Sequence, residues 1–368
     1  MKFSLNIQEN HSLKDLTTMR VGGAASYFVE VKTAEEVEEA IKWADEKSVS
    51  VFVLSGGSNL VVSDHGFPGL VIYINILGYE KVEDADEVLI KVGAGEEWDS
   101  VVDRSVKGGL WGIENLSLIP GRMGAFVVQN GGAYGQECSE FLEKVEVYDK
   151  KEKKAKELLN KDCGFEYRKS IFNSQEKGRY IILNVFLRLS KKGEPKVDYP
   201  DVSKYFESNN IKEPSLEKIR EAIVYIRSNK LPKVDEIGSA GSFFRNLVLD
   251  DKEYMVLRGN IGKNFDENLV EKLEELKNKF SRDGKIKIPT GWLIDMCGFK
   301  GFSLKGIKVW DKQALVLVNE SGKAKAEDVM EVFQKIRQGV YEKTGMKLQM
   351  EPELVGFSKE EKDKYFEI

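Results

Sequence analysis

The chain has 368 residues, of which 41% are hydrophobic and 32% charged, and its formal net charge is −5. This length exceeds one ordinary hydrophobic core, so two or three domains are expected. The acidic balance argues against a nucleic acid or an anionic membrane surface as the main partner. Residues 1–6 lack a signal-peptide core, and no apolar run is long enough to span a membrane. A cytoplasmic protein is therefore expected.

Cysteine and histidine are too few and too scattered for a metal site. The three cysteines lie far apart in the sequence, and only His11 and His65 could join them. No zinc-binding set can be assembled from these residues. Isolated thiols are typical of a reducing compartment.

Strand and helix signals alternate at the start of the chain. Residues 27–31 predict a strand, and Thr33 with Glu36 forms a capping box that begins a helix. The buried strand predicted at 51–54 leads directly into the small-residue turn Ser55–Asn59. These segments together predict a β-α-β unit closed by a glycine-rich turn.

A second unit of the same kind follows. A strand at 88–92 precedes a helix at about 96–107, and strands are predicted at 143–149 and 180–189. Residues 191–195 indicate a boundary. Beyond it, we expect helices at 215–230, 267–280 and 326–343 and a strand at 314–318.

Two glycine-rich stretches suggest ligand contacts. The Ser55–Asn59 turn would direct backbone N–H groups at anionic oxygens, although a plain tight turn is equally compatible with it. It matches neither a dinucleotide fingerprint nor a P-loop. Two further clusters, 119–124 and 130–135, flank the apolar run 125–128. The two clusters, joined by this run, would lay backbone along a large flat or extended ligand, or they would be two β-bulges or turns.

Other candidate residues are ambiguous by themselves. Ser242 lies in the glycine-containing loop 238–246, and the two aromatic residues that follow it in this loop look exposed. The loop could bind a substrate, form a turn in a sheet or bind a phosphate weakly. Arg168, among aromatic residues, could clamp a carboxylate or stack on a ring. Glu353 would ordinarily be a surface carboxylate, and Lys230 a cation at a helix C-terminus.

Taken together, the segments resemble the UDP-N-acetylenolpyruvoylglucosamine reductase (MurB) family, flavoenzymes of peptidoglycan precursor synthesis. The resemblance runs from Asn10 to Glu353 in the family's order. It is carried by the segments 55–59, 119–121, 129–135, 167–172, 230–232, 240–246, 291–295, 313–317 and 351–353.

The resemblance implies an α+β fold with a two-lobed FAD-binding region of the vanillyl-alcohol-oxidase (PCMH-like) type and a C-terminal α/β substrate domain. The lobes are expected at 1–80 and 81–195, the substrate domain at 196–355 and a tail at 356–368. FAD would be bound non-covalently, with NADPH as co-substrate and a UDP sugar as substrate. A monomer without nucleic-acid or membrane partners is expected, with roles in cell-wall biogenesis, cell shape and cell division.

The resemblance also assigns residues. The catalytic residues would be Arg168, Ser242 and Glu353. FAD would be contacted by Ser55, Gly56, Gly57, Ser58, Asn59, Pro120, Gly121, Gly124, Gln129, Asn130, Gly132, Ala133 and Tyr134. The substrate would be contacted by Tyr167, Tyr199, Lys230, Asn246 and Gln313, with Tyr199 as the mobile tyrosine of the family's tyrosine-loop type, in the segment 190–212.

The implied reaction reduces UDP-N-acetylglucosamine enolpyruvate to UDP-N-acetylmuramate. Hydride would pass from flavin N5 to C3 of the enolpyruvyl group, and Ser242 would protonate C2. Arg168 and Glu353 would stabilise the charge that develops on the carboxylate. A serine hydroxyl is a weak acid, so Ser242 would need help from its neighbours.

The sequence departs from the family pattern at four places. Leu247 stands where proline is usual, which suggests a less rigid loop, and Met19 replaces phenylalanine. Arg122-Met123 and Phe126-Val127 are bulkier than the small residues expected there, which puts the local cofactor contacts in question.

Two other functions are compatible with parts of this sequence. Another FAD-dependent oxidase or dehydrogenase of this fold could act on an alcohol or sugar, but neither histidine lies where a covalent flavin link would form. A catalytically silent nucleotide-binding or scaffold protein is disfavoured because all three catalytic positions are filled. A visible spectrum would separate these classes.

Overall fold

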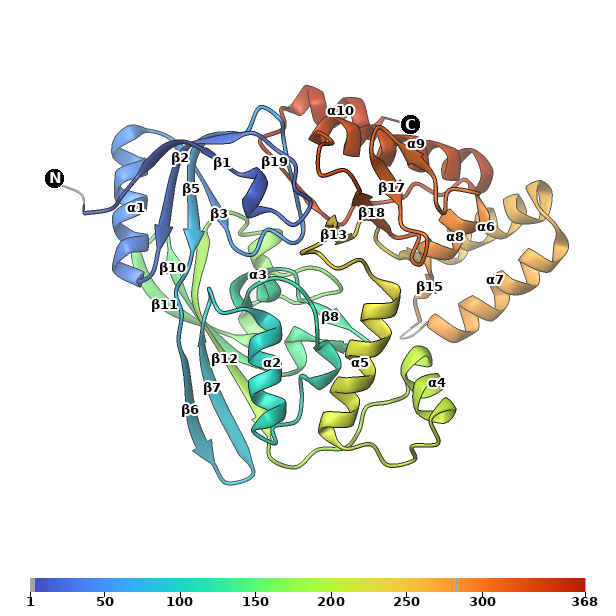
Figure 1. Cartoon of the computed structure of the whole chain (residues 1–368), viewed down its shortest axis with the longest axis horizontal. Helices are drawn as coiled ribbons and strands as arrows, with labels where there is room; N and C mark the ends of the chain where they lie inside the picture. The colour runs from blue at the N-terminus through green and yellow to red at the C-terminus, as the bar shows by residue number, and fades with distance from the viewer. Residues whose placement is uncertain (1–3, 282–283, 368) are drawn as a thin grey trace. The chain divides into compact units, whose positions relative to one another are not determined.

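The computed structural model describes residues 4–281 and 284–367 (Figure 1). The chain forms two compact units. The first comprises 1–11, 25–57 and 68–229, and the second comprises 12–24, 58–67 and 230–368. These units divide the chain differently from the expected domain boundaries, which remain predictions.

The first unit begins with a four-stranded sheet of order β1-β2-β5-β3. The Thr33 side chain accepts a hydrogen bond from Glu36 N at 3.2 Å, which caps the first helix as predicted. Strands β3 and β5 run parallel, with Leu54 opposite Tyr73. The bounds are β1 (Gln8–Ser12), β2 (Ala24–Val31), α1 (Ala34–Lys47), β3 (Ser50–Leu54) and β5 (Phe67–Ile74).

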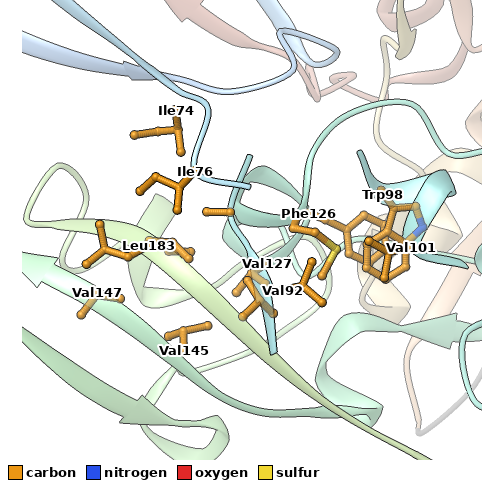
Figure 2. Packing of buried hydrophobic residues seen from close by; sticks show 14 of the residues in the cluster. Ile74, Ile76, Val92, Trp98, Val101, Phe126, Val127, Val145, Val147 and Leu183 are labelled. Atoms are coloured by element: carbon orange, nitrogen blue, oxygen red, sulfur yellow. The ribbon is translucent and has the colours of Figure 1, made fainter. Parts of the chain in front are cut away.

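A five-stranded antiparallel sheet of order β11-β10-β12-β7-β6 completes this unit. Its side chains join those of α2 and α3 in one hydrophobic core (Figure 2). Val145, Val147 and Leu183 of the sheet lie in the same cluster as Val101 and Phe126 of the helices. The bounds are β6 (Tyr79–Asp84), β7 (Glu87–Gly93), α2 (Trp98–Lys107), α3 (Met123–Val128), β8 (Gly132–Ala133), β9 (Gln136–Glu137), β10 (Leu142–Asp149), β11 (Lys154–Leu159) and β12 (Tyr180–Ser190).

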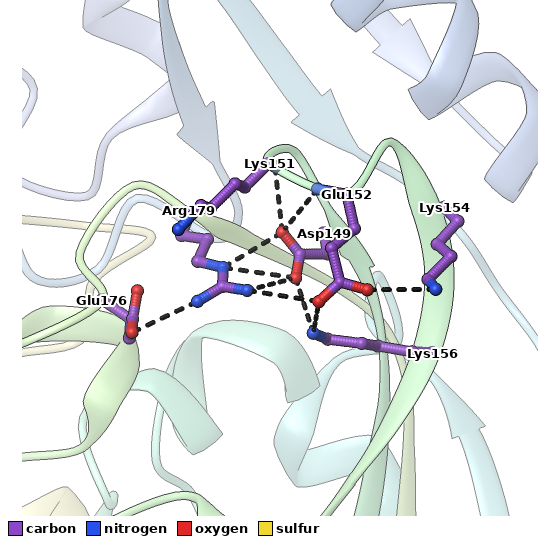
Figure 3. A network of polar contacts seen from close by, with 7 residues as sticks. All are labelled: Asp149, Lys151, Glu152, Lys154, Lys156, Glu176 and Arg179. Atoms are coloured by element: carbon purple, nitrogen blue, oxygen red, sulfur yellow. Dashed lines mark hydrogen bonds and ion pairs between the residues drawn. The ribbon is translucent and has the colours of Figure 1, made fainter.

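A charged network closes the β10–β11 hairpin (Figure 3). The Asp149 carboxylate is fully buried and contacts Arg179 Nη2 at 2.8 Å and Lys156 Nζ at 2.6 Å. It also accepts hydrogen bonds from the backbone N–H groups of Lys151 and Glu152. These partners, Arg179 first, hold the pKa of Asp149 well below its usual range.

Two helices at the end of the first unit form a small core of their own. Helices α4 (Pro200–Ser208) and α5 (Leu216–Lys230) bury Val202, Phe206 and Ile219, and Trp111 and Tyr134 pack against this core. A two-pronged ion pair ties α5 to α2, with Arg220 contacting Asp99 at 2.7 and 3.0 Å.

The second unit contains a sheet of order β13-β18-β17-β16, the pairs β14-β15 and β19-β4, and helices α6–α10. Its core gathers Phe243, Phe244 and Phe333. The bounds are β4 (Leu60–Val62), β13 (Gly238–Ser242), β14 (Leu247–Leu249), α6 (Asp251–Asn264), α7 (Glu267–Phe280), β15 (Ile286–Ile288), α8 (Thr290–Met296), β16 (Ser303–Leu304), β17 (Ile307–Val309), β18 (Val316–Asn319), α9 (Ala326–Thr344), β19 (Glu353–Val355) and α10 (Lys359–Phe366). Five short 3₁₀ turns cover 14–16, 114–116, 138–140, 160–162 and 171–173.

In the described residues, no helix combines the length and the apolar character needed to cross a membrane. Within the same ranges, 4–281 and 284–367, no group of His, Cys, Asp or Glu is arranged to hold a metal ion. The three cysteines are buried and free.

Candidate functional site

The Ser55–Gly57 turn follows β3 directly. Gly57 has a φ of +61°, a backbone conformation that glycine adopts without strain. The Ser55 hydroxyl is buried and has no hydrogen-bond partner among the described residues. Because a buried polar atom is normally paired, this hydroxyl suggests a ligand contact.

Two glycines bring the turn against the first glycine cluster. A Cβ on Gly56 would lie 2.8 Å from Cα of Gly121, closer than side chains can approach backbone. Gly121 itself has a φ of +120°, and its carbonyl accepts a hydrogen bond from Trp98 N at 3.0 Å. Residues 55–57 and 121 therefore form a close pair of backbone segments without side-chain obstruction. We call this pair the glycine cradle.

The apolar run 125–128, which joins the two glycine clusters, belongs to helix α3. Phe126 stacks on Trp98 with ring centroids 3.5 Å apart, inside the core (Figure 2). The Trp98 indole in turn donates to Leu116 O at 2.8 Å. Apolar packing at the 3.6-residue period, rather than ligand contact, accounts for this apolar run.

The bulky Arg122 also makes contacts within the first unit. Its guanidinium lies 4.6 Å from the centre of the Tyr73 ring, and Nη1 donates to Ile74 O at 2.7 Å. Met123 is fully buried. Each of these residues, like Phe126, is accommodated by packing in the first unit, which accounts for their size.

Three non-glycine residues around the second glycine cluster adopt positive φ: Asn130 (+44°), Tyr134 (+49°) and Arg168 (+54°). Such strain persists only where surrounding contacts impose it, and it is concentrated at functional sites. Arg168 Nη2 donates to Gly132 O at 2.7 Å, and its guanidinium lies 5.3 Å from the Tyr167 ring centre. The structure thus brings Arg168 and Tyr167 to residues 130–134.

Tyr199 stands at the N-cap of α4, and Pro200 begins that helix. Residues 200–208 of the segment 190–212, in which the mobile tyrosine is expected, are helical. The Tyr199 ring meets Tyr134 edge to face, with centroids 5.2 Å apart. Burial raises the pKa of Tyr199 to about 12, so its hydroxyl stays protonated.

In the second unit, Ser242 ends strand β13 rather than lying in a loop. It is half-buried and pairs with Val316 of β18, after Gly241, which has a φ of +71°. Phe243 and Phe244 are fully buried, although their position in the sequence makes them look exposed. Their burial anchors the backbone that presents Ser242.

The segment that carries Glu353 is hydrogen-bonded to the residue that follows this strand. Phe243 O accepts a hydrogen bond from Glu351 N at 3.0 Å, and Glu353 pairs with Leu60 in the parallel β19-β4 ladder. Asn59 O accepts from Glu353 N at 3.0 Å. The end of the small-residue turn, 58–59, therefore lies beside the segment that carries Glu353.

The three remaining substrate candidates belong to the same unit. Asn246 Oδ1 accepts from Thr290 N at 3.1 Å, and Gln313 precedes Leu315, whose carbonyl accepts from Phe243 N at 2.7 Å. Lys230 O accepts from the Trp310 indole at 3.1 Å.

Leu247 corrects another expectation. Its N–H donates to Thr290 Oγ1 at 3.1 Å, a bond that proline cannot make, and Thr290 Oγ1 donates to Arg245 O at 2.7 Å. The loop after Ser242 is therefore tied down. Thr290, the first residue of α8, is a supporting residue that the sequence did not indicate, because a lone threonine at the start of a helix gives no signal beyond capping.

The expected residues thus fall into two groups. Arg168, Tyr167, Tyr134 and Tyr199 gather in the first unit with the glycine cradle. Ser242, Glu353, Asn59, Asn246 and Gln313 gather in the second.

Comparison with known proteins shows which families the two parts of the chain match. Residues 25–154 match the model of an FAD binding domain, and residues 232–355 match the C-terminal domain of UDP-N-acetylenolpyruvoylglucosamine reductase. A Thermus caldophilus structure of that reductase superposes with a TM-score of 0.65 at 24% identity, covering 95% of this chain and 99% of that one. The expected α+β fold, an FAD-binding region followed by a C-terminal domain, is confirmed.

Curated relatives extend over nearly the whole chain. A UDP-N-acetylenolpyruvoylglucosamine reductase of Bdellovibrio bacteriovorus is 36% identical over 349 residues, which is 95% of this chain and 99% of the relative. The Pseudomonas aeruginosa reductase is 36% identical over 352 residues, with 95% and 99% covered. The chain therefore belongs to the UDP-N-acetylenolpyruvoylglucosamine reductase family of FAD-dependent oxidoreductases.

Proposed function

We propose that this protein reduces UDP-N-acetylglucosamine enolpyruvate to UDP-N-acetylmuramate with NADPH, in peptidoglycan precursor synthesis. The observation that carries the proposal is the end-to-end match to relatives with that activity in their names. The two groups of site residues support it, because each contains groups suited to a different part of the task.

The glycine cradle fits a cofactor that carries a diphosphate. Backbone N–H groups free of side chains and a buried, unpartnered hydroxyl at Ser55 are the donors that anionic oxygens require. We assign residues 55–59, 120–121, 124, 129–130 and 132–134 to FAD, bound non-covalently. When bound, FAD supplies the hydride.

Ser242 is proposed as the proton donor to C2 of the enolpyruvyl group. Its backbone is held on one side by the β18 pairing and on the other by Phe243, which contacts both Leu315 and Glu351 through backbone bonds. A hydroxyl fixed at a strand end can deliver a proton to one atom repeatedly. Neither histidine of the chain lies in this segment.

Arg168 and Glu353 are proposed to stabilise the carboxylate as negative charge develops on it. Arg168 is held by Gly132 O and Asn130 O, and its guanidinium is a planar fork that matches the geometry of a carboxylate. Glu353 would act protonated or through water. Tyr167, Tyr199, Lys230, Asn246 and Gln313 would contact the carboxylate and the UDP sugar.

An optical titration of the purified protein tests this function. The account expects a yellow protein that NADPH bleaches and that the enolpyruvyl UDP sugar recolours, whereas oxygen recolours it slowly. A colourless protein would favour the scaffold alternative, and rapid recolouring by oxygen in the absence of the UDP sugar would favour an oxidase. A cytoplasmic monomer remains a prediction, as does membership of the tyrosine-loop type.

A further inference from the structure

Asn115 has a fully buried side-chain amide that contacts two segments, one containing Tyr134 and one leading to Tyr199. Its Nδ2 donates to Lys196 O at 2.7 Å and to Tyr134 O at 3.4 Å. Its Oδ1 is buried without a partner among the described residues. One side chain therefore bridges the glycine-rich segment and the segment that leads to Tyr199.

The platform under Asn115 is rigid. The 3₁₀ turn Glu114–Leu116 is held by the Trp98 indole at Leu116 O and by the Ser117 hydroxyl, which donates to Glu114 O at 2.6 Å. The Glu114 carboxylate accepts from Gly112 N at 2.7 Å. Such a platform fixes the position of the Asn115 amide.

The segment after Lys196 is short and held from its other end. The Ser203 hydroxyl donates to Val197 O at 2.7 Å, and Tyr199 O accepts from Val202 N at 2.8 Å and Ser203 N at 2.9 Å. Tyr199 thus lies between the Asn115 bond upstream and the first turn of α4 downstream. The edge-to-face contact of Tyr199 with Tyr134 depends on the distance between their two backbones.

We propose that Asn115 is a positioning residue that sets the spacing of Tyr134 and Tyr199 and thereby the affinity for the UDP sugar. This inference rests on the proposed function, because Tyr199 matters only if it meets that ligand, and Tyr134 acts here as the ring against which Tyr199 is placed. Asn115 itself touches neither cofactor nor substrate in this account. Without its amide, two carbonyl oxygens lose their donor, and the Tyr199 segment is free to move away from Tyr134.

The test compares Asn115→Ala with Asn160→Ala. Asn160 is a matched control in the same unit, because its Nδ2 also donates to two backbone carbonyls, Ser139 O at 2.8 Å and Leu142 O at 2.7 Å. For Asn115→Ala we expect KM for the enolpyruvyl UDP sugar to rise about 10-fold or more, as for the loss of uniform binding. In Asn115→Ala, the rate at which NADPH bleaches the flavin should stay near the wild-type value. In Asn160→Ala, both this rate and KM should stay near their wild-type values.

A KM unchanged in Asn115→Ala, or equally raised in Asn160→Ala, would overturn the inference, as would a parallel loss of the NADPH step. If Asn115→Ala does not fold, Asn115→Ser replaces it, because serine keeps a donor in less volume. The Asn115 variant that folds is then combined with Tyr199→Phe. If both residues act together, the rise in KM of the double variant should differ from the product of the two single rises, and a simple product would contradict the proposal. Failure of the wild type to be recoloured by the UDP sugar would instead contradict the proposed function.

Discussion

Substitution of Gly56 by alanine tests the glycine cradle. A Cβ at this position would lie 2.8 Å from Gly121 Cα and 3.2 Å from both Gly121 C and Arg122 N. All three atoms belong to backbone, so no side chain can rotate to relieve the overlap. Either the Ser55–Gly57 turn or the 120–122 segment must shift.

The magnitude follows from overpacking. One extra methyl group in a tight contact costs about 1–3 kcal/mol when backbone must move. If that shift separates the donors that face the diphosphate, the loss appears in cofactor affinity as an increase of about 5-fold to 150-fold in the FAD dissociation constant. The remainder of the cost appears as a lower free energy of unfolding of the FAD-free protein.

Gly259→Ala is the matched control. Gly259 lies inside α6, and a Cβ there meets nothing within 4 Å. This substitution should stabilise the protein by about 0.5–1 kcal/mol and leave FAD affinity unchanged. Flavin fluorescence titration gives the dissociation constant, and urea unfolding gives the stability. Wild-type FAD affinity in Gly56→Ala would refute the cradle, whatever happens to stability.

Two further predictions concern charged residues. Asp149→Asn should lower the free energy of unfolding by about 3 kcal/mol at pH 7, because Arg179 and Lys156 lose a buried partner. Folding lowers the pKa of Asp149, so this contribution is present above about pH 4 and is lost as the pH falls further. The free energies of unfolding of wild type and Asp149→Asn, measured with urea, should therefore converge in acid. A difference that stays constant with pH would contradict this reasoning. Arg168→Lys should slow substrate reduction by about 10-fold or more at saturating NADPH, because lysine cannot both bond Gly132 O and face a carboxylate with a planar fork. Steady-state kinetics measures this loss, and wild-type turnover would remove Arg168 from the proposed catalytic set.

Regular elements with a strong period were predictable from the sequence. The helix after Thr33, the strand at 51–54 and the long helix near 326–343 all appear at nearly the expected residues. Helix α6 was not predicted, since its apolar residues Met255 and Val256 are exposed and blur the 3.6-residue stripe.

Aromatic residues near the site were harder to place. Phe243 and Phe244 follow a glycine turn and look exposed, but their burial depends on Phe333, which lies far along the chain. Phe126 reads as part of a ligand-binding run, but its stacking partner is Trp98. A partner that is distant in sequence leaves no local pattern.

Backbone support was equally hidden. From the sequence, Leu247 indicates only that the usual proline is missing. The structure shows that its N–H donates a hydrogen bond to Thr290 Oγ1. Asn115 lies in an ordinary-looking segment, and its role became visible only from its contact with Lys196 O. The candidate residues themselves came from the family resemblance, and their assigned roles remain predictions.

Stopped-flow kinetics of Ser242→Ala tests the central claim most directly. The account predicts that NADPH bleaches the flavin at nearly the wild-type rate, while the enolpyruvyl UDP sugar recolours it about 100-fold more slowly or worse, because the general acid is missing. Ser303→Ala, which removes an exposed hydroxyl from β16 of the same unit, should recolour at nearly the wild-type rate. Recolouring of Ser242→Ala at the wild-type rate would contradict the assignment of Ser242 as the proton donor.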